Sequence, residues 1–201
     1  IQSKTRPAAC LHGGYRMNTN FKHPIHTIDD LKGLKLLGPA VALQLAAFRA
    51  WGVEPHPLAW TETFNGLQQG VIDGQENPHS VNRAQKFWEV QKYITEIHYK
   101  MWIGPIVVNA AWFERQPENV RQAILEGGRI ATENNRKMIA DMEAELGTSI
   151  KASRVEIVSK PEDEDLWREK AMSVWPQFYD KIGDVSLLDA MMKSLGRSRP
   201  Q

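Results

Sequence analysis

The stretch at 60–78, WTETFNGLQQGVIDGQENP, constrains the fold of this chain more than any other part of it. Thr61 can cap a helix there, and Gly70 can end it, because glycine readily adopts the left-handed conformation that follows a helix. The apolar pair at 71–72 then predicts a short strand, which closes in an Asp-Gly turn at 73–74. The pattern therefore indicates a helix, a strand and a turn in immediate succession.

Three polar residues, Gln75, Glu76 and Asn77, follow this turn directly before Pro78. Proline fits the first position of a helix, so we expect Asn77 to be the N-cap. A strand whose polar tip leads into a helix N-terminus is the usual ligand-binding place of an open α/β sheet, since donors and the helix dipole converge there. Taken alone, these signals fit a small-ligand site and a well-capped loop equally well.

Composition excludes several classes of function. The 201 residues are 42% hydrophobic and 24% charged, enough for one or two globular lobes with a sizeable core. The formal net charge of +1 gives no field that would attract nucleic acid or an acidic membrane surface. The single cysteine, Cys10, cannot form an internal disulfide, and we expect it to be a small buried apolar residue. No motif indicates a cofactor or a metal site.

An enzyme is the main alternative to a binding protein. Asp73, Glu76 and His79 recur every three residues, which on an unbroken helix would place two carboxylates and an imidazole on one face for acid–base chemistry or metal binding. Gly74 and Pro78 interrupt that helix. The sequence also lacks the common hydrolase, zinc-protease and phosphate-loop motifs. A ligand-sensing domain is a further alternative.

The other segments alternate between helical and extended patterns, which predicts an α/β fold. Two glycines at 127–128 interrupt a long helical pattern and suggest a break between two helices. The expected helices are 27–33 with a Thr-x-x-Asp capping box, 40–51 with an apolar surface nearly all round, one after Pro78, 117–146, 159–182 with a kink at Pro176, and 186–196; the last two each begin with a serine capping box. The expected strands are 34–37, 53–60, 90–95, 97–109 and 150–158.

Several of these segments together resemble one known family. GLQQGVIDGQENP at 66–78, with AWTE at 59–62 and DLKGLK at 30–35, resembles the solute-binding proteins of tripartite ATP-independent periplasmic (TRAP) transporters, the DctP superfamily. The resemblance runs from GGYR at 13–16 to VVN at 107–109 and continues more loosely beyond. It implies an α/β, periplasmic-binding-protein-like (type II) two-lobed fold with mixed sheets and hinge strands.

The same resemblance implies a function. Such proteins close on a small, usually anionic organic solute in the periplasm and deliver it to the membrane subunits of the TRAP transporter. Full-length members carry a signal peptide and a further stretch ahead of GGYR, so this chain resembles their C-terminal two thirds and its first lobe is expected to be incomplete. We therefore expect exposed apolar surface, an open sheet edge and self-association.

The resemblance also suggests a division of the chain into lobes. We expect a remnant of lobe 1 and a hinge strand at 1–36, and lobe 2 at 37–96. Residues 97–150 would return to lobe 1 and supply its helices. The C-terminal helices at 151–201 would pack across the lobes.

Site residues follow from chemistry and from the resemblance together. A buried carboxylate needs a bidentate donor, and the planar guanidinium of Arg16 supplies one. Trp60 can form an apolar wall for the carbon chain of the solute, and Asn77 and Asn109 can donate hydrogen bonds. The residues expected to shape the site as neighbours are Gln75, Glu76 and Phe64. Each of these residues also has an ordinary role as a cap, a core aromatic or a surface group.

One position departs from the family. Most relatives carry an arginine that clamps the solute carboxylate in the strand that continues from LKGLK at 31–35, and this chain has Leu37 at that position. Losing a charge-assisted bidentate contact should cost about 1.5–3 kcal/mol of binding free energy. Lys35 lacks the planar fork needed to replace it. We therefore expect a solute that is less acidic or more apolar than a typical dicarboxylate, with Leu37 forming part of its pocket.

Overall fold

The computed structural model describes residues 4–38, 41–152 and 155–201, with side chains described except at 146–152. Two compact units share the chain, and we name them unit 1 and unit 2. Unit 1 comprises 1–17, 77–88 and 98–155, and unit 2 comprises 18–76, 89–97 and 156–201. The lobe boundaries that we expect from the sequence remain a prediction.

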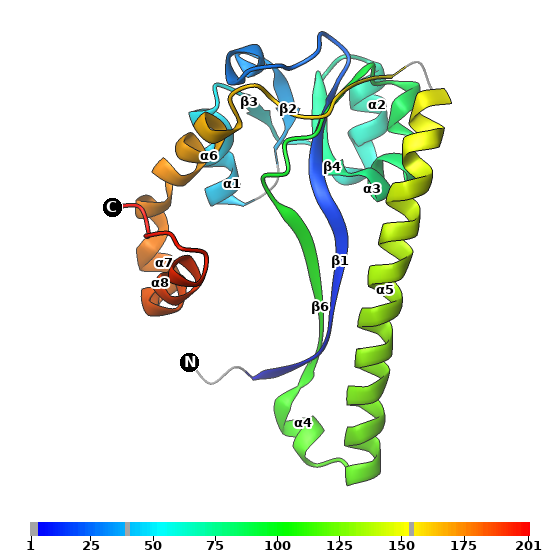
Figure 1. The fold of residues 1–201 in the computed structure, drawn as a ribbon, viewed down its shortest axis with the longest axis vertical. Helices are drawn as coiled ribbons and strands as arrows, with labels where there is room; N and C mark the ends of the chain where they lie inside the picture. Colours follow the sequence, from blue (N-terminus) through cyan, green and yellow to red (C-terminus); the bar gives the residue numbers. More distant parts are fainter. Residues whose placement is uncertain (1–3, 39–40, 153–154) are drawn as a thin grey trace. The chain divides into compact units, whose positions relative to one another are not determined.

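Unit 1 is built on an antiparallel ribbon of two long strands. β1 (Thr5–Asn20) pairs with β6 (Met101–Asn109) from Thr5 opposite Asn109 to Tyr15 opposite Met101. The 35-residue helix α5 (Glu118–Ala152) lies along this ribbon (Figure 1). Thr132 and Asn135 of α5 hydrogen-bond the backbone of β1, at 3.3 Å from the Cys10 nitrogen and 2.8 Å from the His12 nitrogen. The short helices of unit 1 are α3 (His79–Ala84), η3 (Phe87–Glu89, of which Glu89 belongs to unit 2) and α4 (Ala110–Glu114).

The helix break predicted at 127–128 is wrong, since α5 continues through both glycines. A Cβ atom on Gly128 would lie 1.8 Å from the carbonyl oxygen of Ala8, whereas one on Gly127 would meet nothing within 4 Å. Gly128 is therefore the place where α5 comes close to the backbone of β1. The glycine marks a close approach rather than the end of a helix.

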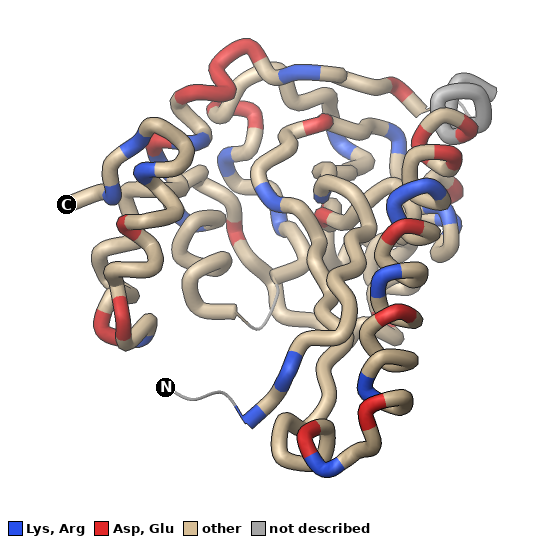
Figure 2. Tube along the Cα trace, turned by 60° about the horizontal axis from the view of Figure 1, so that its bottom comes forward, with Lys and Arg blue, Asp and Glu red and all other residues tan. Residues whose placement is uncertain are grey.

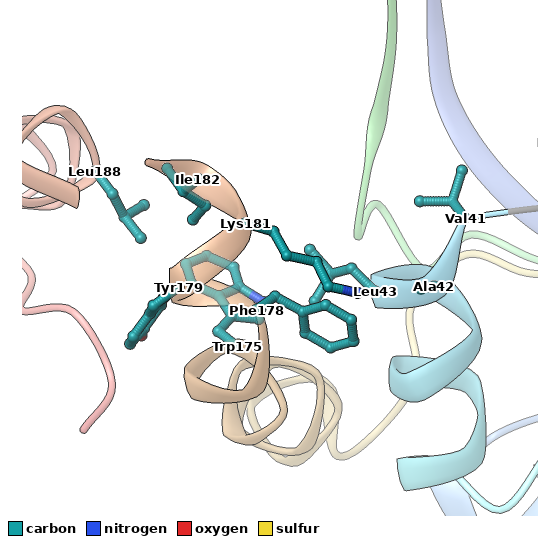
Figure 3. Close-up of a pocket in the computed structure, with 9 residues that line it drawn as sticks. All are labelled: Val41, Ala42, Leu43, Trp175, Phe178, Tyr179, Lys181, Ile182 and Leu188. Atoms are coloured by element: carbon teal, nitrogen blue, oxygen red, sulfur yellow. The ribbon is translucent and has the colours of Figure 1, made fainter. Parts of the chain in front are cut away.

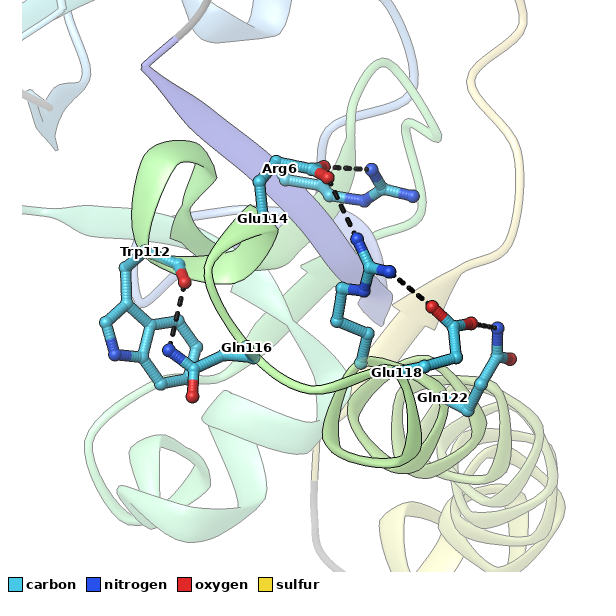
Figure 4. Close-up of polar contacts among 7 residues, drawn as sticks. Arg6, Trp112, Glu114, Gln116, Glu118 and Gln122 are labelled. Carbon is cyan, nitrogen blue, oxygen red and sulfur yellow. Dashed lines mark hydrogen bonds and ion pairs between the residues drawn. The ribbon is translucent and has the colours of Figure 1, made fainter.

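Ion pairs hold the end of unit 1 around α4 (Figure 4). Glu114 accepts from Arg6 at 2.9 Å and from Arg121 at 3.2 Å, and Arg121 also pairs with Glu118. Gln122 donates to Glu118 at 2.6 Å, which together with Arg121 keeps the pKa of that carboxyl below its usual range. Acidic and basic residues alternate farther along α5 as well (Figure 2), so much of the surface of this helix is polar.

Unit 2 contains a mixed sheet with strand order β3-β2-β4-β1-β5-β7, in agreement with the predicted α/β class. β2 pairs in parallel with β3 and β4, β5 pairs in parallel with β7, and β1 pairs antiparallel with β5. The last three residues of β1 provide that pairing. The strands are β2 (Lys35–Leu37), β3 (Glu54–His56), β4 (Gly74–Pro78), β5 (Tyr93–Thr95) and β7 (Glu156–Val158).

An aromatic core fastens two helices of unit 2 to each other. Phe48 stacks on Trp51 of the same chain segment at 5.7 Å between ring centroids, and Trp51 lies 5.4 Å from Trp167. The indole nitrogen of Trp51 donates to the backbone oxygen of Trp167 at 2.9 Å. The helices of unit 2 are η1 (Ile28–Leu31), α1 (Ala42–Ala50), η2 (Trp60–Glu62), α2 (Thr63–Gln68), α6 (Glu164–Ser173), η4 (Trp175–Phe178), α7 (Tyr179–Ile182) and α8 (Val185–Ser194).

The Thr27–Asp30 capping box is confirmed at the start of η1, whereas the two predicted serine caps are wrong. The N-cap of α6 is Asp163, whose carboxylate instead accepts from the backbone nitrogen of Ile28 at 3.0 Å. The N-cap of α8 is Asp184, which accepts from the nitrogen of Ser186 at 3.0 Å. An aspartate therefore occupies the N-cap position of both helices, and only Asp184 caps its helix through a side-chain hydrogen bond.

Four further expectations need correction. α1 is not buried all round, since Leu43 within it and Val41 at its N-cap are exposed. Pro176 does not kink one long helix, because α6 ends at Ser173 and the proline opens η4. Cys10 is exposed rather than buried. The strand predicted at 150–158 includes 153–154, which lie outside the described residues, and its described part is helical to Ala152 and extended in β7.

Candidate functional site

The polar residues expected at the tip of a strand form a strand themselves. β4 spans Gly74–Pro78, and all five of its residues are buried. The pair at 71–72, predicted as the strand, forms the bend ahead of β4. A Cβ on Gly74 would lie 2.0 Å from the carbonyl oxygen of Thr19, so glycine is needed for β4 to enter the sheet.

A chain of hydrogen bonds holds the β4 side chains within unit 2. Gln75 donates to the hydroxyl of Thr19 at 2.8 Å, and that hydroxyl donates to Gln91 at 2.9 Å. Gln44 donates to the carboxylate of Glu76 at 2.8 Å. All five side chains are buried, so each bond satisfies groups that would otherwise lose their solvation. Sequence reasoning missed Thr19, Gln91 and Gln44, because they come from three distant segments.

The acidic residues of the enzyme alternative are engaged in the same region. Asp73 is buried and accepts from the ammonium of Lys22 at 3.0 Å and from the backbone nitrogen of Lys35 at 2.8 Å. Glu76 is bonded to Gln44, and His79 belongs to unit 1 rather than unit 2. Among the described residues, no group of three His, Cys, Asp or Glu side chains could hold a metal ion. The two carboxylates thus serve the sheet of unit 2.

The sequence predicts Asn77 as the N-cap of the following helix, and this prediction is wrong. Pro78 occupies the N-cap position of α3, with φ −60° and ψ 155°, so the helix begins one residue later. Asn77 is buried, and its carbonyl oxygen accepts from Asn82 at 3.4 Å. The predicted contact of Asn77 with a solute stays a prediction.

Arg16 lies half-buried in β1, two residues before the chain passes from unit 1 to unit 2. Its backbone nitrogen donates to the Lys100 oxygen at 2.9 Å. The pairing of β1 with β6 shifts between His12 and Tyr15, and Gly14 there has a φ of +91°, which favours glycine. The Gly-Gly pair therefore interrupts the regular pairing of β1, with only Tyr15 between it and Arg16.

Asn109, at the end of β6, acts as a helix cap. Its side-chain oxygen accepts from the backbone nitrogen of Trp112 at 2.9 Å, which fixes the start of α4. Gln116 donates to the Trp112 oxygen at 3.0 Å and helps to close the same helix (Figure 4). The capping role accounts for Asn109 locally, and its contact with a solute stays a prediction.

The three apolar candidates lie in unit 2 and keep some accessible surface. Leu37, at the end of β2, and Phe64, on α2, are half-buried. Trp60 begins η2 and is 47% exposed. They can therefore contact a ligand, in contrast to the fully buried Gln75.

Comparison with known proteins places the chain in a family. Residues 4–182 match the sequence profile of DctP, bacterial extracellular solute-binding protein family 7. The chain belongs to this family. The described part of the chain contains no helix with the length and apolar character of a membrane span.

Individual DctP-family relatives agree with that assignment and confirm the predicted fold class. The 2,3-diketo-L-gulonate-binding periplasmic protein of Escherichia coli is 32% identical over 75% of this chain and 46% of its own length. A TRAP periplasmic solute-binding protein of Rhodobacter sphaeroides superposes with a TM-score of 0.82 at 38% identity, over 92% of this chain and 60% of its own. One from a Polaromonas species, solved with D-erythronate, gives 0.80 at 28% identity, over 90% and 59%. The chain thus spans about half the length of the curated relative and three fifths of the solved ones.

Proposed function

We propose that this protein is the solute-binding subunit of a TRAP transporter, which captures a small carboxylate-containing solute in the periplasm and delivers it to the membrane subunits. The match to the DctP family over residues 4–182 carries this proposal. The relatives bound to D-erythronate or named for 2,3-diketo-L-gulonate support a hydroxylated carboxylate as the solute. Family members are solute-binding proteins, which favours binding over catalysis for this chain as well.

Three polar side chains would contact the solute directly, and a fourth would support them. Arg16 would bind the carboxylate with its planar guanidinium, a geometry that lysine cannot reproduce. Asn77 and Asn109 would donate hydrogen bonds to hydroxyl or carboxylate oxygens. Gln75 would support the site from within the sheet, held by its bond to Thr19 at 2.8 Å.

Apolar contacts would distinguish this protein from relatives that carry a clamping arginine. Leu37 would replace the usual clamping arginine with an aliphatic surface, and Trp60 and Phe64 would add aromatic surface. Such a pocket favours a solute with one carboxylate and a substantial carbon skeleton over a small dicarboxylate, whose second charge would lack a partner. The half-buried position of Leu37 supports this assignment.

A thermal-shift and calorimetry panel of dicarboxylates, sugar acids, polyols and aromatic acids tests the proposal. Arg16→Lys should weaken binding of the preferred acid by about tenfold or more, the effect of losing a charge-assisted bidentate contact. Arg136→Lys, on the exposed surface of α5, is the matched control and should leave the affinity for the same acid unchanged. Leu37→Arg should strengthen binding of succinate. A natural preference for small dicarboxylates, weakened by Leu37→Arg, would contradict the role given to Leu37.

We also propose that this chain self-associates through the ribbon of unit 1. Trp102, Ile103, Ile106 and Val107 of β6 are each more than 40% exposed, and an exposed apolar strand invites pairing. Replacing Ile103 and Val107 with lysine should shift the chain toward a monomer in light scattering. A strict monomer at high concentration before any substitution would count against this proposal.

A further inference from the structure

A cavity of about 410 Å³ lies within unit 2. It is bordered by the first turn of α1 and by η4, α7 and α8 (Figure 3). Its size falls in the range of roughly 300–1,000 Å³ that is typical of small-molecule sites. None of the residues assigned to the solute under the proposed function lines it.

The walls of this cavity are aromatic and aliphatic. Trp175, Phe178 and Tyr179 supply the aromatic side, and Val41, Leu43 and Ile182 supply aliphatic surface. Val41, Leu43 and Ile182 are 50%, 38% and 45% exposed, so the apolar lining remains open to solvent. Covering it with an apolar ligand would be favourable, at about 25 cal/mol for each Å² of apolar surface removed from water.

One cation, Lys181, lines the same cavity. Its ammonium lies 5.3 Å from the centroid of the Phe178 ring, and no carboxylate among the described residues pairs with it. Figure 3 shows its side chain reaching from α7 toward the first turn of α1. Arg199, whose guanidinium lies 4.7 Å from the centroid of the Tyr179 ring, differs from Lys181 because it bonds Asp189 at 2.8 Å and so has its charge balanced.

The start of α1 also lines the cavity and adds positive character to it. Its N-cap residue is Val41, whose side chain offers no acceptor for the N–H groups of the first turn. An α-helix of nine residues carries a partial positive charge at this end. The apolar cavity therefore has positive charge at its edge from two elements.

We propose that this cavity binds a small hydrophobic organic anion, namely an aromatic or branched monocarboxylate. The apolar part of the ligand packs against the aromatic wall, and its carboxylate faces Lys181 and the start of α1. Sugar acids and small dicarboxylates fit less well, because most of the lining that their hydroxyls or second carboxylate would meet is aromatic and aliphatic carbon. The site shares no lining residue with the solute site of the proposed function, so variants in each site tell the two apart.

Isothermal titration calorimetry with 4-phenylbutyrate, its neutral amide 4-phenylbutyramide, and succinate tests this site in the 201-residue chain. We expect 4-phenylbutyrate to bind and succinate not to compete. Lys181→Gln should weaken 4-phenylbutyrate by about three- to tenfold, as expected for a partly exposed charge-assisted contact, and leave the amide unchanged. Lys193→Gln, an exposed lysine of α8 that does not line the cavity, is the matched control and should have no effect.

A second variant tests the position of the ligand. Ala42→Trp places a large ring at the mouth of the cavity from an exposed position, and it should abolish binding of both phenyl compounds. Arg16→Lys should leave them unchanged, which separates failure of this site from failure of the proposed function. The inference is overturned if 4-phenylbutyrate does not bind at millimolar concentration, if Lys181→Gln weakens acid and amide equally, or if Ala42→Trp still binds.

Discussion

The two units differ in how they bury apolar side chains. Most of the described buried hydrophobic side chains lie in unit 2, while unit 1 contributes Ala9, Met17, Phe87, Phe113 and Ile139. Unit 1 instead exposes much of β6 and relies on backbone contacts and surface ion pairs along α5. Because burial of apolar surface is the dominant stabilising term, we expect unit 2 to be the more stable of the two.

The sharpest test of this difference is the removal of one buried ring from each unit. Phe48→Ala in unit 2 deletes a ring that is 1% exposed and stacked on Trp51, and should cost about 3–5 kcal/mol of unfolding free energy. Phe113→Ala in unit 1 should cost less, because the Arg6 guanidinium, 4.5 Å from the ring centroid, covers one face of that ring in place of an apolar side chain. Denaturant unfolding with hydrogen exchange resolved by segment measures both. Equal losses would mean that the units unfold as one.

A pair of adjacent glycines tests how closely α5 lies on the ribbon. Gly128→Ala forces a Cβ against the Ala8 carbonyl and should destabilise unit 1 by about 1–3 kcal/mol, as overpacking does. Gly127→Ala, the matched control, meets no atom within 4 Å and should stabilise the helix by about 0.5–1 kcal/mol. Thermal unfolding of the two variants should therefore move in opposite directions. If both variants raised the melting temperature, α5 would have to lie farther from β1 than the structure shows.

A smaller effect is expected at the capping box of unit 2. The carboxylate of Asp30 accepts from the backbone nitrogens of Thr27 and His26, each at 2.9 Å, and these bonds lower its pKa, the one from Thr27 most. Since its pKa is lower in the folded state, its stabilisation is present above the unfolded value of 3.8 and is lost as the pH falls through the lower folded value. Asp30→Ala should cost about 1 kcal/mol at pH 7 and progressively less in acid.

The pH dependence of the stabilisation by Asp30 is obtained by measuring the unfolding free energies of wild type and Asp30→Ala from pH 7 down to pH 2.5. Asp29→Ala is the control, because that exposed carboxylate pairs with Lys32 and does not cap. A difference between wild type and Asp30→Ala that stays constant to the lowest pH would rule out the carboxylate as its source.

The smallest effect is expected on the surface of α5 in unit 1. Arg129 pairs with Glu126 and Glu133, each at 2.6 Å, and all three side chains are more than half exposed. Arg129→Gln should lower the melting temperature slightly at low salt and not at all in 1 M salt, because screening removes such pairs. If the melting temperature of Arg129→Gln stays lower in 1 M salt, Arg129 stabilises the helix by packing and not through its ion pairs.

Sequence reasoning succeeded where a local signal sets the structure. The Thr27–Asp30 box and the glycine ends at Gly33, Gly52 and Gly70, all with positive φ, follow from backbone chemistry within a few residues. It failed for β4, because a polar strand becomes stable only through partners on distant segments. It also read the glycines at 127–128 as a break, since nothing nearby in sequence reveals the approach of Ala8.

The candidate site shows the same limit. Chemistry and family resemblance pointed to Arg16, Trp60 and Asn77, and Asn109 proved to have a capping role that its neighbours in sequence could have revealed. The buried support from Gln44, Thr19 and Gln91 could not be predicted, because each residue alone reads as an ordinary surface polar group.

The passage of the chain between the units has a consequence for biosynthesis. The chain changes unit after residues 17, 76, 88, 97 and 155, so neither unit is a contiguous segment. Unit 2 closes its aromatic core only when Trp167 reaches Trp51, which was translated more than a hundred residues earlier. While the chain emerges from its N-terminal end, the sheet of unit 2 therefore stays unfinished until unit 1 has emerged, and its unpaired strands are exposed to aggregation for that interval.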